Sequence, residues 1–492
     1  MQVQADLSSR ITNFPMTYSH YIDGSWQPPI SGRYLPVYDP CTGKEIAQVA
    51  QGDSQDVARV MAAAQAAQVA WSKVPTAERA QRQHRAADLM RHHRAELAGL
   101  LTQELGRPLS GCEREIDRSA ELLDYYAEEA LRLQGSFPLN NLPGEKALVT
   151  RVPVGVVLAI TPFNYPITLL TFKLGAALMM GCPVVAKPAE DTPLSTLRLA
   201  ELFSEAGYPA GTFNVITGYG HEIGDALVGH PVPAKVAFTG GTRTGQHIAA
   251  LAVQRGKRLT LELGGQSPAI VCADADLAQA APAIVKHAFN NSGQFCYRVN
   301  RVYAQRAVYD EFCQRLAEQA APLKVGLPQE GSDLGPLVNE KIYRNSERQI
   351  ADAQARGGRL LTGGERLTKG AFTQGWFLPP TVVADATHEM LLMTEETFGP
   401  VLGVMPFDEP DEAITLANDT PYGLAAYVFA GDVGAGLRLA EALDAGSVWV
   451  NNIRRSYHNV PFGGMKQSGL GREKSQHGLE AYTELKTIYL SY

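Results

Sequence analysis

Apolar residues in the first third of the chain recur at the three- and four-residue spacing of amphipathic helices. This spacing predicts helices over 53–71, 76–105 and 112–133. The first thirty or so residues differ, because Asp23-Gly24 favours a turn and Pro28-Pro29 interrupts regular structure. We therefore expect an irregular start, followed by three helices that flank an α/β core.

From residue 147 onward, short apolar runs replace the helical spacing. Such runs, at 147–161, 183–187, 213–217 and 235–239, are typical of buried strands. Helical segments separate them. The alternation continues to a strand at 447–450, and the tail at 487–492 is also strand-like. This pattern predicts parallel sheets covered by helices on both faces. Ligands bind beyond the carboxyl ends of such strands, so the polar residues that follow each strand form the candidate site.

Composition and charge narrow the class of protein. The 492 residues are enough for two to four domains, each with its own core. The formal net charge of −7, without a basic cluster, argues against binding to nucleic acid. No apolar run reaches the ~18–20 residues that cross a bilayer, and the first residues lack the pattern of a signal peptide. We expect a soluble, cytoplasmic protein without a membrane partner.

The six cysteines include no CxxC pair and are too sparse for a disulfide framework. Metal-ligand spacing is also missing, so we predict no metal site. A single cysteine is usually buried filler. Cys296, in NSGQFCYR, has a different setting, because it follows a polar turn and lies between two aromatic residues. That setting suits an accessible nucleophilic thiol.

Four polar segments follow predicted strands, and each has two interpretations. Asn164, between two prolines in TPFNYP, is either an oxyanion donor or an ordinary turn former. Glu262, in LELGGQSP, is either a general base or a solvated carboxylate. FTGGTRTG at 238–245 is a phosphate-facing helix start or a tight turn, and KPAE at 187–190 is a ribose contact or a solvated loop.

In their order and spacing, these segments resemble the aldehyde dehydrogenase superfamily over nearly the whole chain. Cys296 follows Glu262 by 34 residues, which matches the family's spacing of nucleophile and base. The group it resembles most is the succinate-semialdehyde dehydrogenases. The matching segments are TPFNYP at 161–166, KPAE at 187–190, FTGGTRTG at 238–245, LELGGQSP at 261–268, NSGQFCYR at 291–298, EETFGP at 395–400 and PFGGMKQSGLGRE at 461–473.

The resemblance implies oxidation of an aldehyde to a carboxylic acid. Cys296 would add to the aldehyde, while Asn164 and the Cys296 N–H would stabilise the oxyanion of the thiohemiacetal. Glu262 would then activate the water that hydrolyses the thioester, and its presence favours hydrolysis over acyl transfer to CoA. Lys173 and Glu484 match a family pair that relays a proton to solvent, with a structural ion pair as the alternative.

The resemblance also implies a nicotinamide cofactor, with NAD favoured over NADP. Lys187 and Glu190 would hold the adenosine ribose, where a carboxylate repels a 2′-phosphate. Two positions depart from the family pattern: Gly241 replaces a Ser or Thr, and Phe163 replaces a common Trp. The residues implied to bind the cofactor are Thr161, Pro162, Phe163, Lys187, Ala189, Glu190, Gly220, Phe238, Thr239, Gly240, Gly241, Gly245, Leu263, Gly264, Glu396 and Phe398.

For the substrate, the resemblance favours a small anionic aldehyde such as succinate semialdehyde or sulfolactaldehyde. Ser456 stands at the family's substrate serine, but Phe172 replaces the first of two anion-binding arginines. Candidates for the substrate pocket are Phe172, Tyr297, Arg298, Arg301, Arg454, Arg455 and Ser456. The alternatives are a neutral hydroxy-, aliphatic or aromatic aldehyde, a non-catalytic family member, or a thiol hydrolase that uses no nucleotide.

The architecture implied by the family has three parts. A Rossmann-like NAD-binding domain would comprise 1–129 and 153–263, and an α/β catalytic domain 264–462. A small β oligomerisation arm, formed by 130–152 and 477–492, would pair its strands with a neighbouring subunit. We therefore expect a homodimer or a homotetramer.

Overall fold

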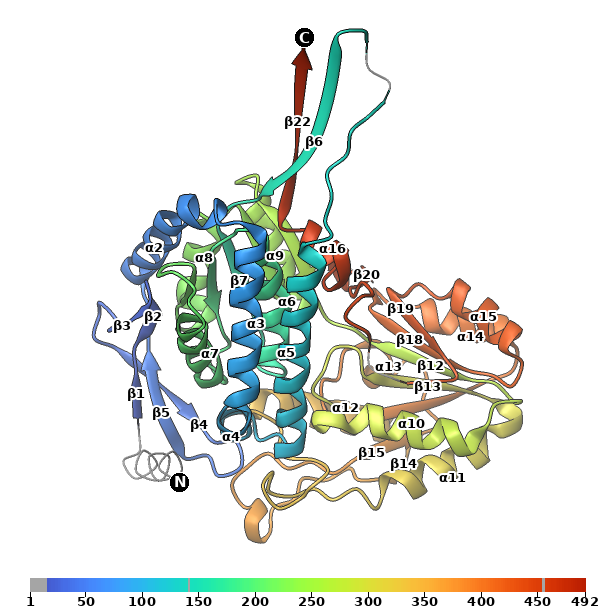
Figure 1. The fold of residues 1–492 in the computed structure, drawn as a ribbon. Coiled ribbons are helices and arrows are strands. Elements are labelled where there is room, and N and C mark those ends of the chain that lie inside the picture. The colour runs from blue at the N-terminus through green and yellow to red at the C-terminus, as the bar shows by residue number, and fades with distance from the viewer. Residues whose placement is uncertain (1–15, 140–141, 454–455) are drawn as a thin grey trace.

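Two large sheets form the framework of the protein. The computed structural model in Figure 1 describes residues 16–139, 142–453 and 456–492. The first sheet has the strand order β21-β11-β10-β7-β8-β9-β2-β3, and the second has the order β14-β15-β16-β13-β12-β18-β19. Parallel pairing runs through the centre of both. The predicted α/β class with parallel sheets is confirmed.

Helices from the first half of the chain pack against the first sheet, because its central strands are apolar on both faces. The strands of this sheet are β2 (His20–Ile22), β3 (Ser25–Gln27), β7 (Val157–Ile160), β8 (Val184–Lys187), β9 (Phe213–Val215), β10 (Lys235–Thr239), β11 (Arg258–Glu262) and β21 (Gly469–Leu470). The helices are α2 (Ser54–Ser72), α3 (Thr76–His92), α4 (Arg94–Leu105), α5 (Leu109–Ala130), α6 (Pro166–Met179), α7 (Leu194–Glu205), α8 (Gly220–Gly229) and α9 (Thr242–Val253).

The second sheet has its own core, formed with the helices of the second half. Its strands are β12 (Ser267–Val271), β13 (Val299–Gln305), β14 (Arg359–Thr362), β15 (Thr381–Ala384), β16 (Val401–Phe407), β18 (Ala425–Phe429) and β19 (Ser447–Val450). The helices are α10 (Leu277–Phe289), α11 (Tyr309–Ala320), α12 (Glu340–Ala355), α13 (Leu391–Thr394), α14 (Pro410–Asn418), α15 (Val433–Ala442) and, near the first sheet, α16 (Ser475–Glu480).

The expectation of an irregular start and no early strand is wrong. Residues 20–27 form β2 and β3, and β2 pairs with β9 at the edge of the first sheet. A small sheet joins β1 (Met16–Tyr18), β4 (Tyr34–Tyr38) and β5 (Glu45–Ala50). These strands are three to six residues long, too short for a periodic signal. The helix predicted over 76–105 is also divided, because His93 ends α3 and α4 starts at Arg94.

An antiparallel pair of strands projects from the body of the molecule (Figure 1). β6 (Glu145–Pro153) pairs with β22 (Thr483–Ser491) along nine residues. Apolar side chains on β22 stay exposed, with Leu485 65% and Tyr489 80% accessible. Two more short strands, β17 (Tyr422–Gly423) and β20 (Met465–Lys466), pair beside the second sheet. Across the described residues, no helix combines the length and apolar character needed to pass through a bilayer.

Candidate active site

Cys296 follows a sharp turn that the backbone adopts at some cost. Asn291, Ser292 and Gly293 all have left-handed φ angles, of 52°, 54° and 73°. A Cβ on Gly293 would lie 2.3 Å from the Gly399 oxygen, so only glycine fits there. The Asn291 amide donates to the Asn164 carbonyl oxygen at 3.1 Å, which ties the turn to the loop that carries Asn164. The sequence therefore places Cys296 after a rigid, strained turn.

Cys296 is the one cysteine of the described chain that is not buried. The backbone of Gly265 approaches it so closely that a Cβ there would lie 2.5 Å from the Cys296 oxygen. Burial of the sulfur raises the pKa of the Cys296 thiol, and the nearby carboxylates of Glu396 and Glu262 raise it further. Cys296 therefore rests as a thiol, which would need a base to become a nucleophilic thiolate.

Glu262 ends β11, and both of its carboxylate oxygens are buried without a hydrogen-bond partner among the described residues. Burial raises the pKa of Glu262 well above its usual range, and the charge of Glu473 adds to the effect. A carboxylate with a raised pKa is a stronger base, so Glu262 has the properties needed to accept a proton from a thiol or from water. This environment excludes the alternative of a solvated carboxylate.

The predicted pairing of Lys173 with Glu484 is wrong. The buried Lys173 ammonium contacts Glu473 Oε1 at 2.6 Å and Thr239 Oγ1 at 2.6 Å. Glu484 lies instead on β22, where Arg258 donates to it at 2.5 and 3.0 Å near the surface. Sequence reasoning missed Glu473, although it is the last residue of the quoted segment PFGGMKQSGLGRE. Lys173 and Glu473 lie close enough to Glu262 to shift its pKa.

Asn164 follows β7 in the loop that leads into α6. The residue is 2% exposed, and its side-chain oxygen has no hydrogen-bond partner in the described structure. Buried Glu115 accepts hydrogen bonds from the Ile167 and Thr168 amides, at 3.1 and 3.0 Å, which anchors the first turn of α6. The loop is therefore fixed from both sides, by Glu115 and by Asn291.

The residues predicted to bind the cofactor follow neighbouring parallel strands of the first sheet. β11, β10, β7 and β8 are adjacent and parallel, so the segments after them meet at one edge. These segments contain 161–163, 187–190, 238–241 and 263–264. Gly220 begins α8 after the next strand, and Gly245 packs against Leu263 within the first turns of α9. These segments thus lie at the same edge of the first sheet.

Glu396 and Phe398 lie in the segment between α13 and β16, and they contact residues at this edge of the first sheet. The Phe398 ring meets the Phe163 ring edge to face, with centroids 5.7 Å apart. The Glu396 carboxylate accepts from the Gly265 amide at 3.0 Å. Burial raises the pKa of Glu396 to about 7. Residues after the first sheet's strands and residues from the second sheet's side are thus in contact at the predicted cofactor site.

Lys187 and Glu190 lie at the end of β8, 3.6 Å apart from Nζ to Oε2. The lysine is buried, and its ammonium also donates to the Pro188 carbonyl oxygen at 3.0 Å. Burial lowers the pKa of Lys187, although Glu190 opposes that shift. The Glu190 side chain keeps 41% of its surface exposed, so its carboxylate is available to accept hydrogen bonds from hydroxyl groups.

Two arginines predicted for the substrate pocket have structural roles, which corrects that prediction. The buried Arg298 guanidinium donates to the Gly399 carbonyl at 2.5 Å and to the Val401 carbonyl. Arg301, on β13 inside the second sheet, donates to the Gln266 and Ala417 carbonyls at 3.1 and 2.7 Å. Both side chains are buried beside the second sheet, where they donate hydrogen bonds to the carbonyl oxygens of neighbouring segments. Arg454 and Arg455 lie outside the described residues.

Aromatic rings surround Tyr297, the residue after Cys296. Its ring packs against Phe462 at 5.5 Å, and Phe462 in turn packs against Phe172 at 6.4 Å. We call these three rings the aromatic row. At its far end, Ser456 Oγ accepts a hydrogen bond from Lys474 Nζ at 2.7 Å. The predictions for Phe172, Tyr297 and Ser456 thus fall in one place, which also contains the unpredicted Phe462 and Lys474.

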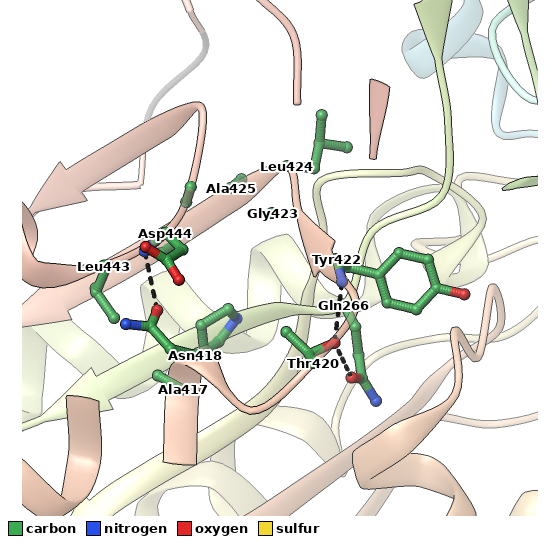
Figure 2. Close-up of a pocket in the computed structure, with 13 residues that line it drawn as sticks. Gln266, Ala417, Asn418, Thr420, Tyr422, Gly423, Leu424, Ala425, Leu443 and Asp444 are labelled. Carbon is green, nitrogen blue, oxygen red and sulfur yellow. Dashed lines mark hydrogen bonds between the residues drawn. The ribbon is translucent and has the colours of Figure 1, made fainter. Parts of the chain in front are cut away.

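A separate small cavity lies beside β12 and the segments that follow α14 and α15 (Figure 2). Its volume is about 10 Å³, which is room for one water molecule. Thr420 donates to the Gln266 side-chain oxygen at 3.2 Å, and the Asp444 amide donates to Asn418 at 2.9 Å. None of the predicted site residues lines this cavity. It is therefore too small to hold an organic ligand.

Comparisons with known proteins agree with this arrangement. The family model described as "Aldehyde dehydrogenase family" matches residues 26–488. The chain is 40% identical to 3-sulfolactaldehyde dehydrogenase from Pseudomonas putida over 471 residues, 96% of each chain. It is 41% identical to the mitochondrial succinate-semialdehyde dehydrogenase of Arabidopsis thaliana over 470 residues, 95% of this chain and 88% of the relative.

The fold comparison leads to the same family. The structure of betaine aldehyde dehydrogenase from Staphylococcus aureus in complex with NAD+ has a TM-score of 0.95 to this protein. The two are 34% identical, and the match covers 100% of this chain and 98% of the other. This likeness confirms the predicted aldehyde dehydrogenase-like, Rossmann-like fold. The chain therefore belongs to the aldehyde dehydrogenase family and is an oxidoreductase that acts on the aldehyde group.

Proposed function

We propose that this protein oxidises a small anionic aldehyde to the carboxylic acid with NAD. The observation that carries the proposal is the arrangement at Cys296: the thiol of this partly exposed residue shares its electrostatic environment with Glu262, a buried carboxylate whose oxygens have no partner in the described structure. A nucleophile beside a base of raised pKa fits acyl chemistry through a thioester.

In the first stage, Glu262 accepts the Cys296 proton and the thiolate adds to the aldehyde carbon. The resulting oxyanion of the thiohemiacetal is stabilised by the Asn164 side-chain amide and the Cys296 backbone N–H. The fixed loop around Asn164 supports this role, because a preorganised donor needs no rearrangement as charge develops. Loss of hydride then leaves a thioester on Cys296.

The residues at the edge of the first sheet fit NAD. Thr161 Oγ1 is buried without a partner among the described residues, and a Cβ on Gly241 would meet no atom within 4 Å. The first turn of α9 thus opens onto free space, where its amides suit a pyrophosphate. Lys187 and Glu190 would hold the adenosine ribose, and Glu396 the nicotinamide ribose. Bound NAD supplies the acceptor of the hydride.

Between the two stages, Glu262 releases the Cys296 proton toward Glu473 and Lys173, which replace the predicted pair of Lys173 and Glu484. In the second stage, Glu262 takes a proton from the water that attacks the thioester, and the C–S bond breaks to release the carboxylic acid and the Cys296 thiolate, which takes that proton back from Glu262. The second oxygen of Glu473 is buried and has no partner in the described chain, so it is able to accept a hydrogen bond from water. A fixed ion pair without proton transfer is the alternative.

Two observations support an anionic substrate. The relatives at about 40% identity are named for sulfolactaldehyde and for succinate semialdehyde, both of which carry a negative group. Within the described structure, Lys474 adds a buried cation near Ser456. A neutral aldehyde is the alternative, because the aromatic row also suits an apolar side chain.

The test is the initial rate of NAD reduction with succinate semialdehyde, sulfolactaldehyde, lactaldehyde and benzaldehyde, and with NADP in parallel. We expect the charged aldehydes to be preferred by about 100-fold in kcat/KM, or ~2.7 kcal/mol of transition-state binding. Cys296→Ser is the control that abolishes turnover. Preference for the neutral aldehydes would overturn the anionic substrate, and no reduction with any aldehyde would overturn the proposed catalysis.

A further inference from the structure

Lys474 is a buried cation in an unusual backbone conformation. Its φ and ψ are 64° and −179°, a region that is essentially restricted to glycine. The residue is nevertheless a lysine and is only 2% exposed. Two hydrogen bonds fix its backbone, because its N–H donates to Tyr126 Oη at 3.1 Å and its carbonyl accepts from the Gly478 amide at 2.7 Å.

The fixed backbone aims the Lys474 side chain at the substrate side of the molecule. Tyr126 also donates to the Phe172 carbonyl at 3.2 Å, which holds Lys474 and Phe172 together. The Lys474 ammonium lies 5.8 Å from the centre of the Phe172 ring. The aromatic row connects Phe172 through Phe462 to Tyr297, the residue after Cys296. Lys474 thus stands at one end of the row and the nucleophile at the other.

The charges around Lys474 leave it uncompensated. Its ammonium donates to the neutral Ser456 hydroxyl at 2.7 Å, and within the described residues it has no carboxylate at salt-bridge distance. Arg118 on α5 adds a second positive charge and donates to the Ser456 carbonyl at 3.0 Å. Glu121, one turn further along α5, faces His458 at 3.4 Å and is half exposed. The adjacent Glu473 is committed to Lys173.

An uncompensated ammonium out of contact with solvent is unfavourable until an anion joins it. Burial, together with Arg118, lowers the pKa of Lys474 to about 7. The His458 imidazole is neutral near pH 7, because burial and the charges of Arg118 and Lys474 lower its pKa to about 4. An anionic ligand would reverse the cost for Lys474 by supplying the missing negative charge.

We propose that Lys474, with Ser456 and Arg118, binds the carboxylate or sulfonate at the end of the substrate remote from the aldehyde. This inference rests on the proposed function. The chain of the substrate would lie along the aromatic row, with its carbonyl carbon at Cys296. Lys474 would therefore be the residue that selects anionic aldehydes, in place of the arginine that Phe172 replaces.

The test compares Lys474→Met with Lys474→Arg, using succinate semialdehyde and butanal, which has the same carbon count without the charge. We expect Lys474→Met to lower the ratio of the two kcat/KM values by about 100-fold, because a buried charge partner is lost. Lys474→Arg should restore most of that ratio. Lys466→Met is the matched control, since Lys466 also has a positive φ but pairs with Asp444; it should leave the ratio unchanged.

The pH dependence provides a second readout. Lys474 is charged below pH 7 and loses its proton above it, so kcat/KM for succinate semialdehyde should fall above pH 7 relative to butanal. In Lys474→Arg that relative fall should disappear. Equal losses on both substrates in Lys474→Met would assign Lys474 a structural role, and an unchanged ratio would remove it from the anion site. Failure of the wild type on both aldehydes would instead overturn the proposed function itself.

Discussion

At the scale of single residues, burial sets the pKa values of the carboxyl and thiol groups at the candidate site. Burial raises the pKa of both Cys296 and Glu262, and the charge of Glu262 raises that of Cys296 further. The same burial makes Arg298 and Arg301 structural, since each satisfies carbonyl oxygens of neighbouring segments. Proximity in the sequence to Cys296 is therefore a weak indicator of contact with substrate.

Replacing Glu262 by Gln removes the base that we propose for both stages of the reaction. The amide has the shape of the carboxylate but is not a base, so hydrolysis of the thioester should slow by about 10²–10⁴-fold. Stopped-flow measurement with succinate semialdehyde should then show slow steady-state turnover. If steady-state turnover stays at the wild-type rate, Glu262 is not the base for water. Glu222→Gln, on the surface helix α8, is the matched control.

Residue identities were predictable wherever a motif specified them. Asn164 and Glu262 lie at the ends of strands, as the motifs predict, and Cys296 follows a polar turn. The rings of Phe163 and Phe398, from two different motifs, contact each other. The partner of Lys173 was not predictable from spacing, because α16 and the preceding turn fold back on α6 from 300 positions away. Lys474 carries no motif, so only its conformation and contacts reveal it.

At the scale of elements, the turn before Cys296 depends on one glycine. Gly293→Ala would require φ near 73° for a residue with a Cβ and would bring that Cβ to 2.3 Å from the Gly399 oxygen. We expect a loss of at least about 1–3 kcal/mol in the free energy of unfolding, together with loss of activity. Thermal unfolding and NAD reduction measure the two effects.

The control for this substitution is Gly224→Ala on α8, where a Cβ would meet no atom within 4 Å. An alanine in a helix interior is neutral or slightly stabilising. A Gly293→Ala variant as stable and active as Gly224→Ala would show that the turn relaxes without cost.

The long elements were predictable from periodicity, and the short ones were not. α2 and α5 begin and end within three residues of the predicted bounds, 53–71 and 112–133. The strands between residues 16 and 50 are set by pairing with distant partners such as β9, which no local pattern encodes. α3 and α4, which the break at His93 separates, both pack on α5.

At the scale of the whole molecule, we propose that the strands β6 and β22 join a neighbouring subunit. A two-stranded ribbon is marginally stable alone, and this one exposes Leu485, Tyr489 and Leu490 on β22. The domain division at residues 263 and 264 is likewise a proposal, and the separate cores of the two sheets support it. The arm accounts for an expected homodimer or homotetramer.

Leu485→Arg should weaken that association, because it introduces a charge into an apolar contact surface. Light scattering after size-exclusion chromatography should show a lower mass for the variant than for the wild type at equal concentration. Val69→Arg on α2 is the control, since Val69 is 62% exposed and lies on a helix of the first sheet. A monomeric wild type, or an unchanged mass in Leu485→Arg, would contradict the proposal.

The strand order of the first sheet has a consequence for how the chain is made. Its edges come from residues 20–27 and 469–470, while its centre comes from 157–262. A nascent chain of 400 residues therefore lacks both an edge strand of this sheet and the carboxylate that neutralises Lys173. Contacts of such separation slow folding. The part of the molecule built on the first sheet should thus complete its folding last, after the second sheet has been synthesised. Until then its unpaired edge is exposed, and chaperones would bind the incompletely folded chain.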